Sequence, residues 1–206
     1  MKRRDEIKKN GRLLFNEQGL ETITTRHIAG EMNISQGNLH YHFPNKNELI
    51  SELYEDFKRG LVERAKYQAG SFGLKEIYQS LQDNFELMYE YRFLFLDREI
   101  LWRRLPTIKR ETQALIIIKS RQLRAAIQKL QEVGLFRTDV DEKQSESFIT
   151  MYQLMINSWL SAVYLFHSHE PVAFFSEQAF RAWYPYLTDI GKYDFRSILA
   201  RSTDLV

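Results

Sequence analysis

The stretch from Thr24 to Lys46 constrains the fold more than any other part of the chain. It predicts two short helices joined by a tight turn and followed by the start of a third. Thr24 or Thr25 is a suitable N-cap for the first helix, and Ser35 is one for the second, Gln36–His42. The three residues before the second helix make the turn.

Apolar residues at helical spacing in this stretch predict one small core, formed by Ile28, Met32, Ile34, Leu39 and Phe43. The residues left outward on the second helix are Gln36, Gly37, Asn38, His40, Tyr41 and His42. This face has hydrogen-bond donors and acceptors, no acid, and a glycine that allows a close backbone approach. The layout is typical of a helix-turn-helix, whose second helix enters the major groove of DNA.

The start of the third helix carries an unusual cation. Asn45 and Glu48 have the spacing of a capping box, so Lys46 falls in the first helical turn. The helix macrodipole disfavours a cation there. A lysine at this position is reasonable if a phosphate occupies the helix N-terminus and the lysine helps to hold it.

This segment resembles the DNA-binding motif of the tetracycline-repressor (TetR) family over about the first quarter of the chain. The matching positions are Thr25, Ile28, Ala29, Ser35, Gly37, Leu39, Tyr41, Phe43 and Lys46. Two residues depart from the family pattern: His40 stands where a tyrosine is common, and Gln36 where a lysine is frequent. If His40 contacts a phosphate, DNA affinity becomes mildly pH-dependent, because histidine titrates near neutrality.

The resemblance implies an all-α protein with two domains. We expect a three-helix DNA-binding domain over residues 1–47, joined by a helix over 45–69 to a ligand-binding and dimerisation domain over 48–206. The candidates for contact with base edges are Gln36, Gly37, Asn38 and Tyr41, and the candidates for phosphates are Thr25, Ser35, His40, His42 and Lys46. Residues 1–47 hold eight Lys/Arg against five Asp/Glu, whereas residues 48–206 hold 21 against 22, so the positive excess lies with the helix-turn-helix.

Other classes of protein are disfavoured by composition. The chain has no cysteine, which excludes disulfides and thiolate sites. It has no nucleophile elbow, phosphate loop or HExxH pattern, so we expect neither an enzyme nor a cofactor. His167, His169 and Glu170 lie close together, but at a helix end, so no metal site is predicted. No apolar run reaches the ~18 residues of a membrane span, and no signal peptide is recognised, so we expect a cytoplasmic protein without membrane contact.

Helical periodicity continues through the rest of the chain. After a break at 70–73, helices are predicted over 74–92, 93–105 and 106–133, and then from a capping box at Asp139–Glu142 to about His167. The apolar run 114–118 is expected at the domain centre. A further helix begins at Pro171, and the tail from Lys192 is predicted to be polar with a possible short helix.

The aromatic content of the C-terminal domain has two interpretations. Fourteen Phe, eleven Tyr and three Trp make an ordinary core, or they also line a mostly apolar pocket with a few polar anchors. The resemblance implies such a pocket for a small effector among the central helices. The candidate lining residues are Phe57, Phe85, Met88, Tyr89, Phe95, Trp102, Met151, Tyr152, Met155 and Trp159.

The last two long helices have more apolar surface than one partner can cover. This surplus predicts an isologous homodimer paired as a four-helix bundle through residues 142–189. The candidate interface residues are Ile156, Leu160, Val163, Tyr164, Phe175, Ala179, Phe180 and Trp183.

The function expected from these features is a DNA-binding transcriptional regulator. A symmetric dimer would read a pseudo-palindromic operator in double-stranded DNA with recognition helices roughly 34–36 Å apart. A small, partly apolar effector would release a repressor by shifting the helix over 45–69. The alternatives are an effector-independent architectural or cell-cycle DNA-binding protein on the same scaffold, and a helical enzyme or interaction protein with a vestigial helix-turn-helix.

Overall fold

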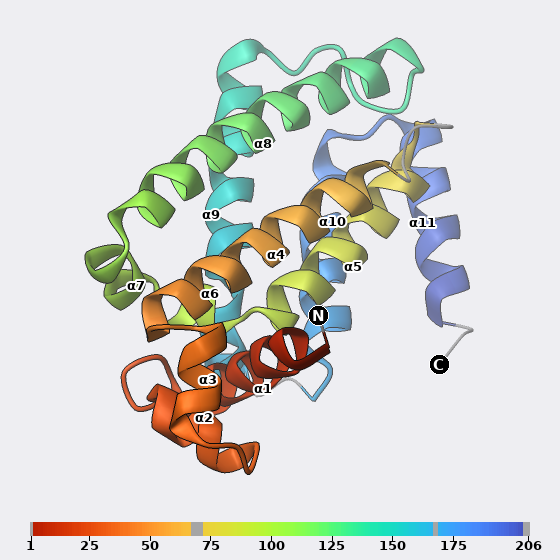
Figure 1. Cartoon of the computed structure of the whole chain (residues 1–206). Helices are drawn as coiled ribbons and strands as arrows, with labels where there is room; N and C mark the ends of the chain where they lie inside the picture. Colours follow the sequence, from red (N-terminus) through yellow and green to blue (C-terminus); the bar gives the residue numbers. More distant parts are fainter. Residues whose placement is uncertain (1, 67–71, 167–168, 204–206) are drawn as a thin grey trace. The chain divides into compact units, whose positions relative to one another are not determined.

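The computed structural model describes residues 2–66, 72–166 and 169–203. Within these ranges the chain folds into eleven α-helices and one 3-10 helix. Figure 1 labels the α-helices. The β-type pairing found there is an isolated bridge between Phe136 and Leu187. The prediction of an all-α fold is confirmed.

The helices follow one another with short connections. In chain order they are α1 (Lys2–Gln18), α2 (Thr25–Glu31), α3 (Gln36–His42), α4 (Lys46–Lys66), α5 (Leu74–Glu90), α6 (Phe93–Leu96), α7 (Arg98–Arg104), α8 (Pro106–Glu132), α9 (Glu142–Phe166), α10 (Pro171–Arg181), the 3-10 helix η1 (Tyr184–Tyr186) and α11 (Asp189–Thr203).

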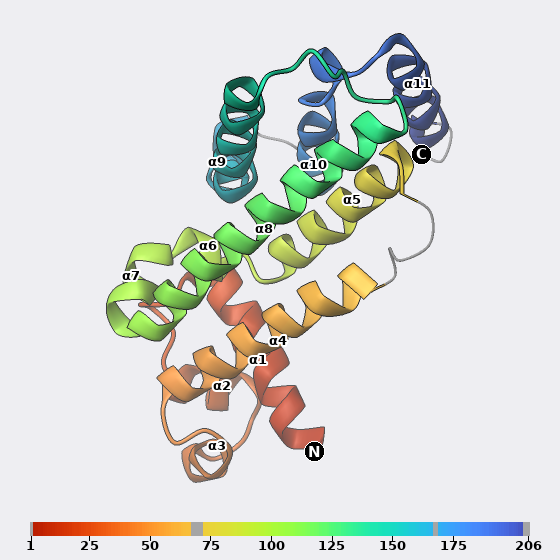
Figure 2. The same ribbon diagram turned by 90° about the horizontal axis from the view of Figure 1, so that it is seen from above.

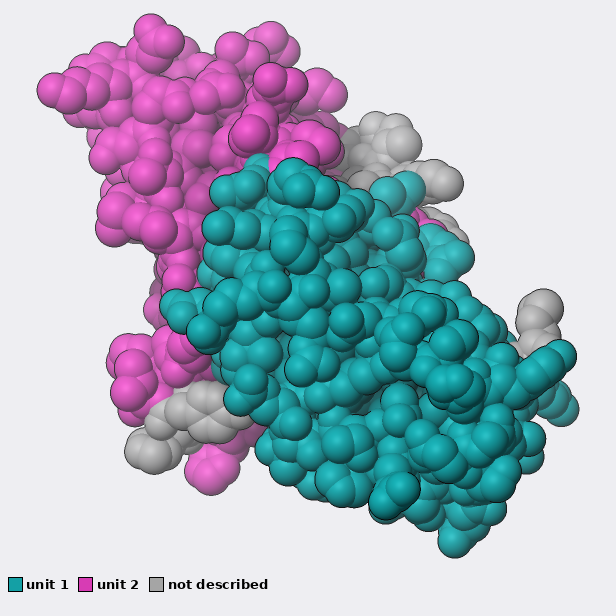
Figure 3. Space-filling model, turned by 60° about the vertical axis from the view of Figure 1, so that its left-hand side comes forward, with its two compact units in different colours: residues 1–62, 87–113 teal, residues 63–86, 114–206 magenta. Residues whose placement is uncertain are grey.

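The chain divides into two compact units, which Figure 3 colours separately. Unit 1 comprises residues 1–62 and 87–113, and unit 2 comprises residues 63–86 and 114–206. Helices α4, α5 and α8 each contribute residues to both units. These units are defined by packing, so the functional boundary expected after residue 47 stays a prediction.

Unit 1 contains the three-helix head and the short helices α6 and α7. Helix α1 contacts α2 and α6, and α2 contacts α3, an arrangement that Figure 2 shows from above. The head has a fully covered apolar core, which includes Ile7, Phe15, Ile28, Leu39 and Phe43. Gly11 allows α1 to approach α4, because a Cβ there would lie 2.9 Å from Leu49 Cδ2.

The segment 93–105 is two helices, not the single helix expected. Asp97 separates α6 from α7, and its carboxylate accepts a hydrogen bond of 2.7 Å from the backbone N–H of Leu20. This contact with a residue far away in the sequence interrupts the helix at Asp97. The periodicity of residues 93–105 therefore did not reveal the break.

Two expectations for unit 2 are also wrong. The N-cap of α9 is Asp141, since Asp141 Oδ1 accepts from Gln144 N at 2.7 Å and Gln144 Oε1 accepts from Asp141 N at 3.1 Å. Asp139 instead pairs with Arg137. The 114–118 run is not central, because Ile117 and Ile118 are about half exposed on α8.

Aromatic side chains form most of the core of unit 2. Trp159 lies against Phe85 (ring centroids 4.7 Å apart) and Phe175 (5.5 Å). Phe180 stacks on Phe195 of α11 with centroids 4.4 Å apart. Helix α11 is therefore a fifteen-residue packed element, whereas the sequence predicted a polar tail with a possible short helix. A single buried aromatic in a charged segment is a weak periodic signal.

Candidate DNA-binding site

The start of α2 is fixed by a capping box that the sequence pattern did not reveal. Thr24 is the N-cap: its Oγ1 accepts from His27 N at 3.3 Å, and His27 Nδ1 accepts from Thr24 N at the same distance. Glutamate or glutamine ordinarily fills the second role. Here the imidazole of His27 fills that role, with Nδ1 as the acceptor.

The turn between α2 and α3 has the expected residues in a tight conformation. Asn33 adopts a φ of 52°, in the left-handed region that asparagine tolerates better than most residues. Ile34 N donates to Ala29 O at 3.0 Å. Ser35 caps α3 by accepting from Asn38 N at 3.1 Å. The prediction of α3 over Gln36–His42 with Ser35 as its N-cap is confirmed.

Helix α3 presents a polar, acid-free surface. Its exposed residues are Gln36, Gly37, Asn38, His40 and Tyr41. Tyr41 leaves 84% of its surface exposed, and a Cβ on Gly37 would meet nothing closer than 4.0 Å. Leu39 and Phe43 anchor the opposite side in the core. A buried apolar edge and an exposed polar edge are what a recognition helix needs.

One of the candidate base-reading side chains is oriented by a neighbour. Gln36 Nε2 donates to Thr25 Oγ1 at 2.9 Å, which links the start of α3 to the start of α2. The oxygen of the Gln36 amide and the hydroxyl proton of Thr25 stay available for DNA. His42 is half-buried, with its ring 5.2 Å from that of Tyr41.

Lys46 has an internal role that was not expected. Its ammonium donates to the carbonyl of Leu20 and lies 5.8 Å above the Phe15 ring. Burial, followed by the charge of Arg104, lowers the pKa of Lys46, while Glu21 and Asp97 act in the opposite direction. An ammonium has three N–H groups, so the phosphate contact stays a prediction beside this structural hydrogen bond.

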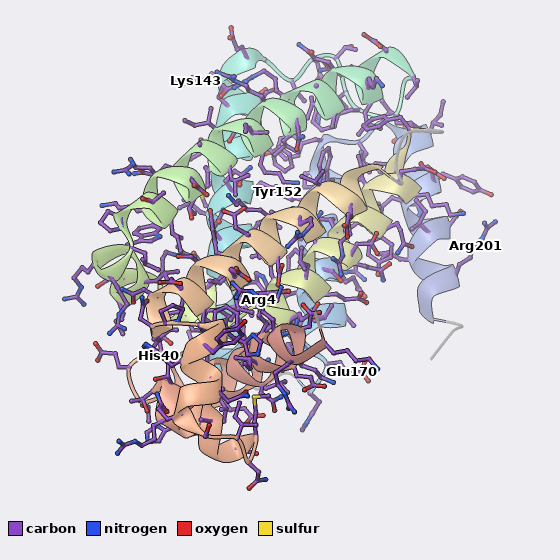
Figure 4. All side chains as sticks on the ribbon, viewed as in Figure 1. Arg4, His40, Lys143, Tyr152, Glu170 and Arg201 are labelled. Atoms are coloured by element: carbon purple, nitrogen blue, oxygen red, sulfur yellow. The ribbon has the colours of Figure 1, made fainter. Side chains whose placement is uncertain are left out.

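The basic residues at the N-terminus are partly committed to the head itself. Arg4, labelled in Figure 4 together with His40, donates to Glu52 and to the carbonyl of His42. Its guanidinium lies 4.3 Å from the centre of the Phe43 ring, and the hydrogen bond with Glu52 is the largest cause that raises its pKa. Lys8 pairs with Asp56 at 2.8 Å. These two side chains join α1 to α4.

Arg26 is a candidate that the sequence interpretation missed. It is exposed in the first turn of α2, between Thr25 and His27. Within the described part of the chain no ion pair neutralises it. The available signal was the one used for Lys46: a cation near a helix N-terminus, where the macrodipole disfavours it.

One side chain connects the end of α1 to the α5–α6 corner of unit 1, and two others hold the residue that follows α1 and Gly19. Asn16, which is 9% exposed, donates to Glu90 O at 2.8 Å and accepts from Phe93 N at 3.1 Å. Asp97 holds the N–H of Leu20, and Lys46 holds its carbonyl. Both backbone groups of Leu20, in the loop that follows α1, are therefore held by side chains from other parts of unit 1.

The ten candidate pocket residues are divided between the two units. Phe57, Met88, Tyr89, Phe95 and Trp102 belong to unit 1, whereas Phe85, Met151, Tyr152, Met155 and Trp159 belong to unit 2. Phe57 packs on Tyr91 and Phe95, with centroids 5.8 and 5.6 Å apart. Tyr152 is buried against Phe148 and Trp183, and burial raises its pKa. These contacts are those of a packed core, and a common pocket stays a prediction.

One pocket candidate is wrong. Met151 is 63% exposed on the outer side of α9, so its side chain faces solvent instead of an interior site. The sequence could not separate the two sides of α9, because apolar residues occur on both.

Most of the candidate interface residues lie in the core of their own chain. Leu160, Phe175, Ala179, Phe180 and Trp183 are buried within unit 2. A side chain that its own chain covers has no surface to offer a partner, so these five assignments are wrong. Ile156 and Val163 are half-buried, and the side chain of Tyr164 lies outside the described residues.

The described residues contain no group of three or more side chains arranged to hold a metal ion. Of the group His167, His169 and Glu170 noted in the sequence, His167 lies outside these residues. In the same ranges, no helix combines the length and the apolar character that crossing a bilayer requires.

Two family models match the chain in succession. Residues 9–53 match the family described as bacterial regulatory proteins, tetR family. Residues 54–195 match the family described as bacterial transcriptional repressor. Together they span the helix-turn-helix and nearly all of the rest.

Two curated relatives match a shorter part. The HTH-type transcriptional repressor KstR2 of Mycolicibacterium smegmatis is 36% identical over 55 residues, 27% of each chain. The nucleoid occlusion factor SlmA of Mannheimia succiniciproducens is 34% identical over 55 residues, 27% of this chain and 26% of that protein. The matched segment thus spans about a quarter of these relatives.

The fold has a full-length counterpart among solved structures. A TetR-family transcriptional regulator from Marinobacter aquaeolei VT8 superposes with a TM-score of 0.87, covers 98% of both chains and is 25% identical. This similarity includes the C-terminal helices. The segments matched in the two curated relatives are only 55 residues long.

Proposed function

The chain belongs to the TetR family of bacterial transcriptional repressors, and on that premise we propose that it holds a pseudo-palindromic operator as a homodimer and releases it when a small effector binds. It is a DNA-binding transcriptional regulator and not an enzyme. The observation that carries the proposal is the exposed, acid-free face of α3 on a packed three-helix head. The binding would take place in the cytoplasm, where the operator lies.

In this proposal the head divides its contacts between bases and phosphates. Asn38 and Tyr41 project from α3 toward base edges, with Gly37 allowing close approach and Gln36 oriented by Thr25. Thr25, Arg26, Ser35, His40, His42 and Lys46 surround them and are assigned to the sugar-phosphate backbone. Genomic selection of bound DNA fragments, with and without candidate small molecules, tests the operator and the effector together.

The first test separates sequence reading from general affinity. Asn38→Ala removes a side chain that can pair with adenine in the major groove. We expect the affinity for the selected operator to fall about 10-fold, which corresponds to about 1.4 kcal/mol, while binding to mixed-sequence DNA is unchanged. Fluorescence anisotropy on both duplexes measures this. Equal losses on the two duplexes would contradict base reading by Asn38.

Lys46→Ala tests the phosphate contact. Loss of one phosphate contact should weaken binding to all sequences and lower the slope of log K against log salt by about 0.9 for each head. Because Lys46 also holds the Leu20 carbonyl, thermal unfolding is measured in parallel. An unchanged salt slope together with a lower melting temperature would assign Lys46 to the fold alone.

The proposed dimer uses an exposed stripe on α9. Met151, Leu154, Ser158, Ser161 and Leu165 recur at intervals of three and four residues and are all exposed. This spacing places them on one side of the helix. Phe174 adds an exposed aromatic ring from α10, which contacts α9. A stripe of apolar and small side chains on both protomers suits an isologous four-helix pairing.

The proposed effector has a polar anchor as well as apolar contacts. Lys119 lies half-buried on α8, and burial lowers its pKa; among the described residues no ion pair with an acidic side chain is found for it. A carboxylate on the effector would supply the missing charge. A 100-fold loss of operator affinity requires a difference of about 2.7 kcal/mol in effector binding between the two states, which one desolvated ion pair and a small apolar group can provide.

The alternative function is effector-independent DNA binding. It is favoured by the 34% identity over 55 residues with a nucleoid occlusion factor. A protein of that kind would retain its DNA affinity in the presence of every metabolite tested and would bind many genomic sites. The same selection experiment distinguishes the two, because a repressor would enrich a few sites and lose them when its effector is added.

A further inference from the structure

A group of exposed cations lies at the junction of α7 and α8, outside the helix-turn-helix. We call Arg103, Arg104, Lys109 and Arg110 the α7–α8 patch; all four side chains are exposed. Residues 98–110 hold five Lys/Arg (these four and Arg98) against the single acid Glu99. The side-chain contacts of the patch are with neutral groups: Arg103 donates to Glu99 O at 3.4 Å, and Arg110 to Thr107 Oγ1 at 3.2 Å.

The patch borders the start of α4. Arg104 donates to Asn47 Oδ1 at 3.5 Å, and Asn47 follows Lys46 directly. After burial, the positive charge of Arg104 is the second cause that lowers the pKa of Lys46. Both elements belong to unit 1, and Figures 1 and 2 both show α7 beside the first turn of α4. The patch therefore continues the cationic surface that begins with the phosphate candidate Lys46.

Two cations of the patch lie near a helix end that disfavours positive charge. Lys109 and Arg110 lie near the beginning of α8, a helix of 27 residues with no acid in its first turn. The macrodipole disfavours cations at that end. Arg103 and Arg104 suit the C-terminal end of α7, but all four together leave a concentrated positive charge unneutralised among the described residues. A polyanion passing over this surface would neutralise it.

We infer that the α7–α8 patch binds the DNA backbone just outside the operator, so that each protomer covers more of the duplex than its helix-turn-helix reaches. This inference rests on the proposed operator binding. Contacts of this kind carry no sequence information and add salt-dependent affinity. In this arrangement one DNA strand passes the start of α4 and then the patch. Cations on the two neighbouring helices α7 and α8 would then contact successive phosphates of that strand.

The test compares two lengths of the selected operator. One duplex ends at the operator boundary, and the other extends ten base pairs beyond it on each side. The variant changes all four patch residues to alanine, which is a good helix former. If each protomer of the dimer loses one or two phosphate contacts, the slope of log K against log salt on the extended duplex should fall by about 2–4 units, at roughly 0.9 per contact. On the trimmed duplex the variant and the wild type should bind equally.

A matched variant controls for net charge. Arg121→Ala, Lys143→Ala, Arg196→Ala and Arg201→Ala remove four exposed cations of unit 2 and should leave both slopes unchanged. An unaltered slope for the patch variant on extended DNA would overturn the inference, and so would an equal loss on both duplexes, which would place the contacts inside the operator. Failure of the wild type to bind either duplex would overturn the proposed function and this inference with it.

Discussion

Leu154→Glu combined with Leu165→Glu is expected to convert the proposed dimer into a monomer and to reduce operator affinity at least about 100-fold. Both leucines belong to the exposed stripe of α9 and leave 57% and 76% of their surfaces uncovered within one chain. In a symmetric pairing through this stripe the four glutamates would be buried in one interface, and desolvated like charges oppose association. Since the second head binds at an effective concentration set by its link to the first, a monomer loses that gain, which is commonly 10²–10⁴.

Sedimentation at micromolar concentration measures the oligomeric state, and anisotropy measures operator affinity. Ile117→Glu with Ile190→Glu is a matched control, because these isoleucines are also exposed but lie on α8 and α11. The control should remain dimeric with unchanged affinity. A dimeric Leu154/Leu165 variant would show that the protomers meet through another surface, and a monomeric variant with full operator affinity would show that one head suffices.

The helix-turn-helix was predictable because its signals are local. Ser35 and Gly19 act through neighbours in the chain: Ser35 caps α3, and Gly19 takes the positive φ of 80° that ends α1. Periodicity then gave the position of α4 and of α10. The same local reading missed the break at Asp97 and the length and packing of α11, where the decisive contacts come from residues far away in the sequence.

The candidate site was predictable as a surface but not in its internal connections. Exposure of Asn38 and Tyr41 follows from burial of Leu39 and Phe43 on the other side of a seven-residue helix. The hydrogen bond between Lys46 and the Leu20 carbonyl does not follow from any spacing. For α9, both sides are apolar, so sequence alone assigned to the interface several residues that the fold buries and missed the exposed stripe.

Asn16→Ala is expected to lower the free energy of unfolding by about 3 kcal/mol and the melting temperature by roughly 6–12 °C. Asn16 is one of the few polar residues buried in the described structure. Its amide satisfies the carbonyl of Glu90 and the N–H of Phe93, which belong to the α5–α6 corner. Alanine leaves both backbone groups without a partner, and each unsatisfied buried group costs about 1–3 kcal/mol. Thermal unfolding followed by circular dichroism measures the change.

Two further variants separate the role of Asn16 from the general cost of changing α1. Asn10→Ala removes a side chain of the same type that donates to Glu6 O on the exposed side of the helix, so we expect a change within about 0.5 kcal/mol. Asn16→Asp keeps an acceptor for Phe93 N–H but loses the donor to Glu90 O, and should fall between wild type and Asn16→Ala. If Asn16→Ala and Asn10→Ala are equally stable, the corner does not hold the head through this side chain. The Asp97 and Lys46 contacts with Leu20 would then have to hold it alone.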